Sequence, residues 1–136
     1  MTKIFIDSDI LLDLLLTRAP FNKFSELLLQ QGKDGKVNLH TSTLIIANIY
    51  YLITKSFDKQ IAKRQVKILI TMMNMLAFEP DDITKALNSE HVDFEDTIQF
   101  FIAQKHGCDL IISRNIKHYK KFTIPVLTAE QFLRTL

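Results

Sequence analysis

The sequence of 136 residues has little of several residue types, with one cysteine, no tryptophan, three glycines and three prolines. A lone cysteine, Cys108, cannot form an internal disulfide, which excludes small disulfide-stabilised scaffolds and favours a reducing cytoplasm. No apolar run approaches membrane-spanning length, and Asp7, Asp9 and Asp13 interrupt the only candidate signal peptide. We therefore expect a cytoplasmic protein without a membrane segment.

No charge sign is in large excess either. Lysine and arginine number 17 against 15 aspartates and glutamates, a net charge of +2, so attraction to nucleic acid has to come from local clusters. The four histidines lack the spacing of a zinc site. Hydrophobic residues make up 47% of the chain, enough for a core, and the length fits one domain spanning residues 1–136.

Apolar segments of strand length alternate with amphipathic segments of helix length. This alternation predicts a three-layer α/β/α fold around a central, mostly parallel sheet. Ser42 and Asp93 are expected to cap helices, and Gly107 to end one. Strands are predicted at 3–7, 37–41, 76–78, 110–113 and 126–128. Helices are predicted at 10–16, 21–31, 43–57, 59–73, 81–88, 94–106 and 129–136.

Acidic side chains follow the first strand and begin a later helix. Asp7 and Asp9 stand at the end of the strand, while Asp93 and Asp96 fall in the first turn of the helix. Functional groups of open parallel sheets gather beyond the carboxyl ends of the strands. We expect Asp7 and Asp96 to converge on a Mg²⁺ or Mn²⁺ site, with Asp9 and Asp93 as further ligands. For Asp93, simple helix capping is the competing interpretation.

Three segments carry a resemblance to a known family: F-I-D-S-D-I-L-L-D (5–13), D-F-E-D-T-I-Q-F-F-I-A (93–103) and I-I-S-R-N (111–115). In this order they resemble the PIN-domain family, which includes the ribonuclease toxins of toxin–antitoxin pairs. The resemblance implies a metal-dependent nuclease that hydrolyses phosphodiester bonds, most simply an endoribonuclease acting on RNA. It also implies a homodimer and an antitoxin protein as partner.

The family pocket has an acid at four positions, which here correspond to Asp7, Asn48, Asp96 and Asn115. Two of the four are therefore amides, which retain an oxygen but remove negative charge. The resemblance thus implies a nuclease with weakened metal binding, in which Asp9 restores part of the charge. Asn48 is equally well explained as a buried amide, and Asn115 as a turn residue.

A basic segment, residues 114–121, contains the fourth family position, Asn115. Its cations are expected to contact the phosphate backbone, and Tyr119 or Phe122 to stack on an RNA base. Serines beside the acids are expected to touch substrate or metal-bound water. A plain solvated loop is the competing interpretation. The residues predicted to contact nucleic acid are Arg114, Lys117, Lys120, Lys121, Ser8 and Ser113.

Two other functions compete with the nuclease. The D-S-D sequence at residues 7–9 imitates the nucleophile and acid/base pair of a haloacid-dehalogenase-type phosphatase, although the later acids do not follow its pattern. A PIN-fold module that binds RNA or protein without cleavage is the stronger rival, because two family acids are amides. A nucleotide-binding Rossmann domain is a weaker alternative than the phosphatase, since no G-x-G-x-x-G follows the first strand.

Overall fold

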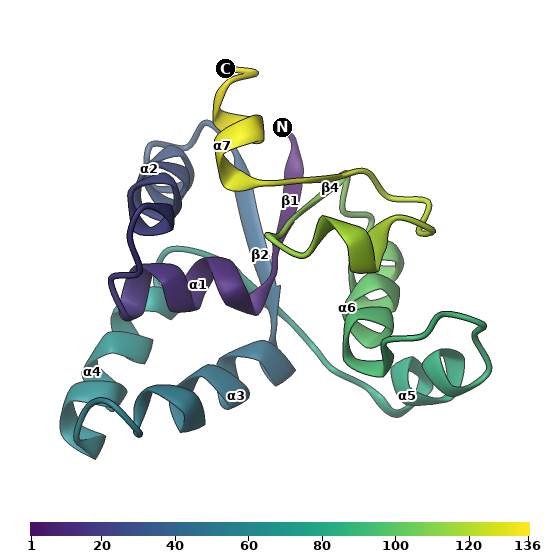
Figure 1. Cartoon of the computed structure of the whole chain (residues 1–136), viewed down its shortest axis with the longest axis horizontal. Helices are drawn as coiled ribbons and strands as arrows, with labels where there is room; N and C mark the ends of the chain where they lie inside the picture. The colour runs from purple at the N-terminus through teal and green to yellow at the C-terminus, as the bar shows by residue number, and fades with distance from the viewer.

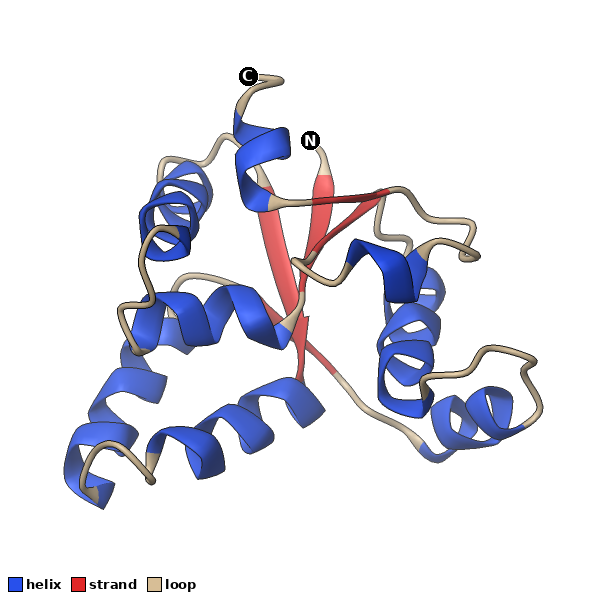
Figure 2. Cartoon of the chain, viewed as in Figure 1, coloured by secondary structure: helices blue, strands red, loops and turns tan.

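The computed structural model describes all of residues 1–136 and contains one five-stranded sheet in the order β3-β2-β1-β4-β5. Every strand pair is parallel, which confirms the predicted α/β class and sharpens "mostly parallel" to wholly parallel. The sheet runs through the middle of the molecule (Figure 2). The strands are β1 (Lys3–Ile6), β2 (Asn38–Ser42), β3 (Asn74–Leu76), β4 (Leu110–Ile112) and β5 (Val126–Leu127).

Helices cover both faces of the sheet. The first four lie on one side, and α5, α6 and a short 3₁₀ helix, η1, on the other, while α7 lies close to α2 (Figure 1). This is the predicted three-layer arrangement. The helices are α1 (Ser8–Leu15), α2 (Phe21–Lys33), α3 (Thr43–Ile53), α4 (Lys59–Ile70), α5 (Pro80–Leu87), α6 (Phe94–Lys105), η1 (Ile116–Tyr119) and α7 (Ala129–Leu133).

The central strands form the most deeply buried part of the core. Ile4, Phe5 and Ile6 of β1 and Ile111 and Ile112 of β4 are all completely buried. Strands of a parallel sheet are covered on both faces, so their side chains are apolar on both faces rather than alternating. This continuous apolar character is what makes β1 and β4 recognisable in the sequence.

Several predicted boundaries were wrong. Helix α2 runs through Gly32 to Lys33, and the positive φ of 73° that allows the turn belongs to Gly35. Strand β3 was predicted at 76–78 but lies at Asn74–Leu76, because the chain leaves the sheet once Leu76 has paired with Ser42. Two residues after the end of β3, Phe78 donates its backbone N–H to the Thr43 side-chain hydroxyl, Oγ1, and not to a neighbouring strand.

Helix α4 is shorter than predicted and ends at Ile70. Helical spacing predicts that Ile61, Ile68, Leu69 and Met72 face inward. Leu69 is buried, together with Ala62, but Ile68 leaves 47% of its surface exposed. The apolar side chains around this helix form a broader stripe than one packing face can cover, so periodicity alone did not select the inner residues. No helix in the structure has the length and apolar character needed to cross a membrane.

Successive strands are added first on one side of β1 and then on the other, and this switch at β1 determines where the site lies. The chain adds β2 and β3 on one side of β1 and then β4 and β5 on the other. In such sheets the crevice forms at the carboxyl ends of the strands beside this switch. Ile6 pairs with Ile112 there, and the Asp7 backbone N–H donates to the Ile112 carbonyl at 3.0 Å. Asp7 and Ser113 are therefore neighbours although 106 residues separate them.

Candidate functional site

Asp7 lies at the centre of the crevice. It follows β1 in an extended conformation and caps α1, with Oδ1 accepting from the Ser8 backbone N–H at 2.8 Å. Its Oδ2 accepts from Ser113 Oγ at 2.8 Å and lies 3.1 Å from the Tyr119 hydroxyl. The residue is only 4% exposed. Both oxygens are thus held by neutral donors, and no lysine or arginine side chain neutralises the carboxylate by direct contact.

Asp9 adds a second carboxylate from the first turn of α1. Its Oδ2 accepts from the Arg114 backbone N–H at 2.9 Å and lies 3.5 Å from Ser113 Oγ. Its Oδ1 is buried without any hydrogen-bond partner. A buried, unpaired carboxylate oxygen is costly, so this atom requires a partner that the protein does not supply.

Asp96 approaches from the opposite side, at the third residue of α6. Asp93 caps that helix, accepting from the Asp96 backbone N–H at 2.8 Å, so the predicted capping role of Asp93 is confirmed. Asp96 Oδ1 lies 3.4 Å from the Tyr119 hydroxyl, and Oδ2 lies 2.7 Å from His118 Nδ1. One hydroxyl therefore stands between Asp7 and Asp96, which places the two predicted acids in the same crevice.

The carboxylates of Asp7, Asp9 and Asp96 repel one another, and burial shields them from the water that would stabilise their charge. Burial, aided by the charge of Asp7, raises the pKa of Asp9 to about 7 and that of Asp96 to about 6. Burial also raises the pKa of Asp7, against the hydrogen bonds from Ser113, Ser8 and Tyr119. The pKa of Tyr119 is raised by burial and by Asp7 and Asp96, so its hydroxyl remains a proton donor. A nearby cation would relieve this repulsion.

The donor set fits a hard divalent cation. Asp7, Asp9 and Asp96 present carboxylate oxygens, the ligands that Mg²⁺ and Mn²⁺ take in proteins. The orphaned Oδ1 of Asp9 offers a coordination position that no protein group occupies. These residues would therefore hold the ion, and Ser113 and Tyr119 would orient Asp7 by hydrogen bonds to its Oδ2.

The two amides at family positions lie apart from these contacts. Asn48 is half-buried in the second turn of α3, and none of the hydrogen bonds that join the carboxylates includes it. Asn115 is exposed and precedes η1 without forming a side-chain cap. Its backbone N–H donates to Ser113 Oγ at 3.0 Å. Hydrogen bonds through Ser113 and Tyr119 thus connect Asp7, Asp9 and Asp96, and neither amide side chain takes part in them.

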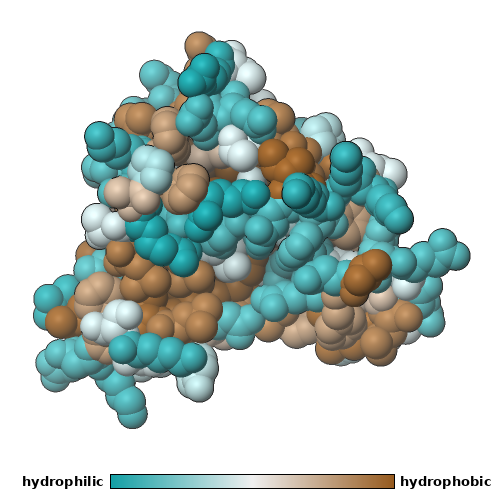
Figure 3. All heavy atoms as spheres, in the orientation of Figure 1, coloured by the Kyte–Doolittle hydropathy of each residue, from teal (hydrophilic) through white to brown (hydrophobic).

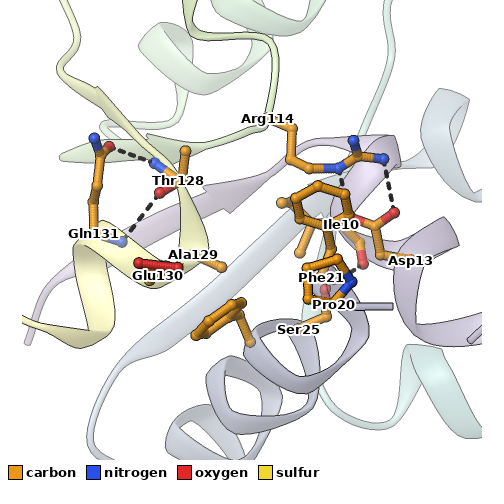
Figure 4. Close-up of a pocket in the computed structure, with 11 residues that line it drawn as sticks. Ile10, Asp13, Pro20, Phe21, Ser25, Arg114, Thr128, Ala129, Glu130 and Gln131 are labelled. Carbon is orange, nitrogen blue, oxygen red and sulfur yellow. Dashed lines mark hydrogen bonds and ion pairs between the residues drawn. The ribbon is translucent and has the colours of Figure 1, made fainter. Parts of the chain in front are cut away.

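Arg114 does not extend toward solvent as its predicted role requires. Its Nε and Nη2 donate to the two carboxylate oxygens of Asp13, each at 2.8 Å (Figure 4). The guanidinium also lies 4.1 Å from the centre of the Phe21 ring. These contacts form one wall of a cavity of about 250 Å³ between α1, α2 and α7. Because Asp13 is fully buried, we assign Arg114 to neutralising that charge instead of binding phosphate.

Three further predictions about individual side chains were wrong or need revision. Ser113 is fully buried and donates to Asp7, so it cannot contact nucleic acid. Tyr119 is 1% exposed, so it cannot stack on a base. The half-buried Phe122 ring already stacks on Phe100, with ring centres 4.2 Å apart. Tyr119 and Phe122 turn inward because their segment packs on α6, and Ser113 because it follows β4 beside Asp7. No local sequence pattern reports these contacts.

The three predicted lysines do remain exposed. Lys117, Lys120 and Lys121 line a cleft of about 380 Å³ together with His91 and His118. The cleft also includes Asp93, so it opens directly beside the acids. Ser8 is half-buried, and its backbone N–H holds Asp7. A polyanion lying along this cleft would reach the acidic pocket at one end.

Sequence reasoning missed three residues that shape the site. His118 and Tyr119 reach the acids from η1, while Asn115, the residue that the family pattern selected, does not. Nothing in the local sequence marks them. Asp13 did carry a signal, since it is a carboxylate among the apolar residues of α1 and therefore had to be paired inside the protein. Both Arg114 and Arg18 contact it.

Comparison with known proteins identifies the family of the chain. Residues 3–117 match the PIN domain family. The chain is 31% identical over 135 residues to Ribonuclease VapC1 of Aquifex aeolicus, covering 96% of this chain and 92% of that protein. DNA-bound VapBC from Salmonella typhimurium shares the fold with a TM-score of 0.73 at 14% identity, covering 95% of this chain and 99% of that one. A toxin–antitoxin complex from Klebsiella pneumoniae matches with a TM-score of 0.67 at 20% identity, covering 93% and 97% of the chains.

Proposed function

Since the chain belongs to the PIN-domain family, we propose that it is a divalent-metal-dependent endoribonuclease that hydrolyses phosphodiester bonds in RNA. The observation that carries the proposal is the group of three converging carboxylates, which have raised pKa values and one buried oxygen without a partner. The name of the Aquifex aeolicus relative, a ribonuclease, supports the choice of substrate. The family membership argues against the phosphatase that residues 7–9 imitate.

Each residue of the pocket has a distinct part in this chemistry. When bound, Mg²⁺ or Mn²⁺ polarises the phosphoryl oxygen and lowers the pKa of an attacking water. Asp7, Asp9 and Asp96 would supply the negative charge that holds the ion. Ser113 and the Tyr119 hydroxyl keep Asp7 in place, since both contact its Oδ2. Because Asp7 is almost fully buried, little rearrangement is needed before reaction.

A cleavage assay tests the proposal and separates it from the non-catalytic alternative. We expect purified protein to cut an end-labelled RNA with Mg²⁺ or Mn²⁺ and to leave it intact with EDTA. Sequencing the products would identify the cleaved bond. If the protein binds RNA but never cuts it with either metal, the RNA-binding module is the better description.

We propose that the cleft lined by Lys117, Lys120 and Lys121, here called the basic cleft, holds the RNA backbone. Replacing Lys117, Lys120 and Lys121 together by alanine should weaken RNA binding, because each lysine that contacts a phosphate releases a counterion on binding. We expect the log–log slope of affinity against salt to flatten by roughly one unit per lost contact. Fluorescence anisotropy over a salt series measures it. A matched control is Lys59→Ala, Lys63→Ala and Lys67→Ala on α4, which removes equal charge from exposed positions of another element. Equal slopes in the two triple variants would contradict the assignment.

The proposed nuclease is weakened by the amide at position 48. A carboxylate there would add charge and an oxygen, so Asn48→Glu should tighten binding of Mg²⁺ or Mn²⁺ and raise cleavage above the parent, by about tenfold if one ligand is gained. Asn48→Ala should weaken metal binding if Asn48 is a ligand, and should only lower stability if it is a buried amide. Calorimetric titration of both variants and the parent decides. Equal metal affinities would remove Asn48 from the site.

Two protein partners are also proposed. The Klebsiella pneumoniae structure is described as a toxin–antitoxin complex, and this supports an antitoxin partner for the present chain. A homodimer follows from the family resemblance. Exposed apolar side chains gather around α3 and α4, among them Tyr51, Leu52 and Ile68, and such surface is available for association (Figure 3). Light scattering on the purified protein measures its oligomeric state.

A further inference from the structure

The outer end of the acidic pocket contains a nitrogen donor. His118 Nδ1 lies 2.7 Å from Asp96 Oδ2 and 3.9 Å from Asp93 Oδ2. One ligand atom from each of these three residues lies within 4.8 Å of the other two. The imidazole comes from η1, whereas both acids come from the start of α6. Two elements that are far apart in sequence thus direct ligating atoms at one point.

Asp96 connects this group to the inner carboxylates. Its Oδ1 faces the Tyr119 hydroxyl, which also contacts Asp7, and its Oδ2 faces His118. The pocket therefore has an inner end with oxygen donors alone and an outer end with two carboxylates and an imidazole. The His118 side chain is 50% exposed, so an ion can reach the outer end from the basic cleft without opening the core.

We propose that His118 is a ligand of a divalent cation held at the outer end of the pocket by Asp93 and Asp96, and that its nitrogen makes this end select Mn²⁺ over Mg²⁺. The inference rests on the proposed function, because Asp96 also belongs to the carboxylates that hold the ion of the proposed nuclease. In this inference His118 takes the place that the family pattern gave to Asn115, whose exposed side chain forms no capping hydrogen bond.

The selectivity follows from ligand chemistry. Mg²⁺ takes oxygen ligands in strict octahedral geometry and keeps several of its waters, so an imidazole adds little to its binding. Mn²⁺ also prefers oxygen ligands. As a first-row transition ion that is larger and softer than Mg²⁺, it nevertheless binds an imidazole nitrogen more strongly than Mg²⁺ does. A site of two carboxylates and one histidine therefore discriminates between two ions that a site of carboxylates alone holds more evenly. A simple hydrogen bond between His118 and Asp96 would leave the discrimination unchanged.

Calorimetric titration with MnCl₂ or MgCl₂ alone tests the inference. His118→Ala should weaken Mn²⁺ binding by about tenfold or more, since losing even an outer-shell partner of a ligand has such an effect. Mg²⁺ affinity should change much less, so the ratio of the two affinities should fall. Lys117→Ala is the matched control from the same 3₁₀ helix, because removing its charge acts on both ions alike and leaves the ratio unchanged. An unchanged ratio in His118→Ala overturns the inference.

A spectroscopic measurement on the unaltered protein gives an independent result. Electron spin-echo modulation of bound Mn²⁺ should show coupling to an imidazole ¹⁴N, and His118→Gln should abolish it. Bound Mn²⁺ without nitrogen coupling means that His118 only hydrogen-bonds Asp96.

The variant Asp96→Asn separates a failure of the His118 inference from a failure of the proposed nuclease site. If that change abolishes metal binding while His118→Ala leaves the ratio intact, only the role of His118 is wrong. If Asp96→Asn and Asp7→Asn both bind metal like the parent, the proposed nuclease site itself is wrong.

Discussion

Replacing Asp7 by asparagine should nearly abolish RNA cleavage while making the metal-free protein more stable at neutral pH. The amide retains the shape of the side chain but removes the charge at the centre of the pocket. A bound cation contributes several kcal/mol of transition-state stabilisation, and each 1.4 kcal/mol corresponds to a factor of ten. We therefore expect a loss of roughly 10³-fold in kcat/KM, measured with saturating Mn²⁺.

The stability gain in Asp7→Asn has a defined pH dependence. The pKa of Asp7 is raised on folding, so the folded protein binds a proton more tightly than the unfolded chain does. That contribution stabilises the fold at low pH and is lost as the pH rises from the ordinary aspartate pKa of 3.8 through the raised pKa of Asp7 in the folded protein. Asp9 and Asp96, with pKa values of about 7 and about 6, extend the loss to neutral pH. Asparagine cannot ionise, so the advantage of the variant should grow over this range.

Urea unfolding at a series of pH values, with EDTA present, measures this difference. Asp109→Asn is the matched control, since Asp109 is an exposed aspartate before β4 that accepts from the Lys3 backbone N–H. Its removal should leave cleavage unchanged and should not reproduce the pH-dependent gain. Normal cleavage by Asp7→Asn would remove this residue from the proposed mechanism.

Replacing Arg114 by alanine should lower the free energy of unfolding by about 2 kcal/mol without changing the salt dependence of RNA binding. Removing one partner of a buried ion pair costs roughly 3–5 kcal/mol. The expected loss is smaller here because Arg114 is 32% exposed and Arg18 remains 2.9 Å from Asp13. The packing of the guanidinium on Phe21 is lost as well. Urea unfolding and the anisotropy salt series supply the two readouts.

Two further variants sharpen this prediction. Arg114→Lys retains the charge but cannot bond both oxygens of Asp13, so its stability should fall between the parent and Arg114→Ala. Arg18→Ala removes a single, more exposed contact and should cost less than Arg114→Ala. If Arg114→Ala were as stable as the parent and its salt slope one unit flatter, the original expectation of a phosphate contact would stand after all.

Sequence patterns predicted the local features of the fold because each depends on neighbouring residues. Ser42 and Asp93 cap α3 and α6 as expected, since a cap requires only a side-chain acceptor and a backbone N–H three residues later. Gly107 follows α6 with a φ of 70°, a conformation that glycine adopts without strain. Strand β1 was evident from its continuous apolar residues. The ends of the helices and the residues that face the core were predicted less accurately. Helix α4 ends earlier than predicted and leaves Ile68 exposed.

Only part of the candidate site could be predicted from the sequence. Asp7 and Asp96 were identifiable because the end of a parallel strand and the start of a helix meet at the carboxyl edge of the sheet. The contacts around them join residues 112 positions apart for Tyr119 and Asp7, and 101 apart for Arg114 and Asp13. Which side chains of residues 114–122 turn inward depends on how that segment packs against α6 and α1, and local periodicity carries no information about such packing.

The sequence by itself determined that the chain forms a parallel α/β sheet with carboxylates at its carboxyl edge, because apolar runs, caps and turns act over a few residues. Only the tertiary structure decided what surrounds those carboxylates. The strand order places Ser113 next to Asp7, the packing of η1 brings His118 and Tyr119 onto Asp96, and the buried charge of Asp13 draws Arg114 away from solvent. Long-range packing and the cost of burying unpaired charge set these contacts.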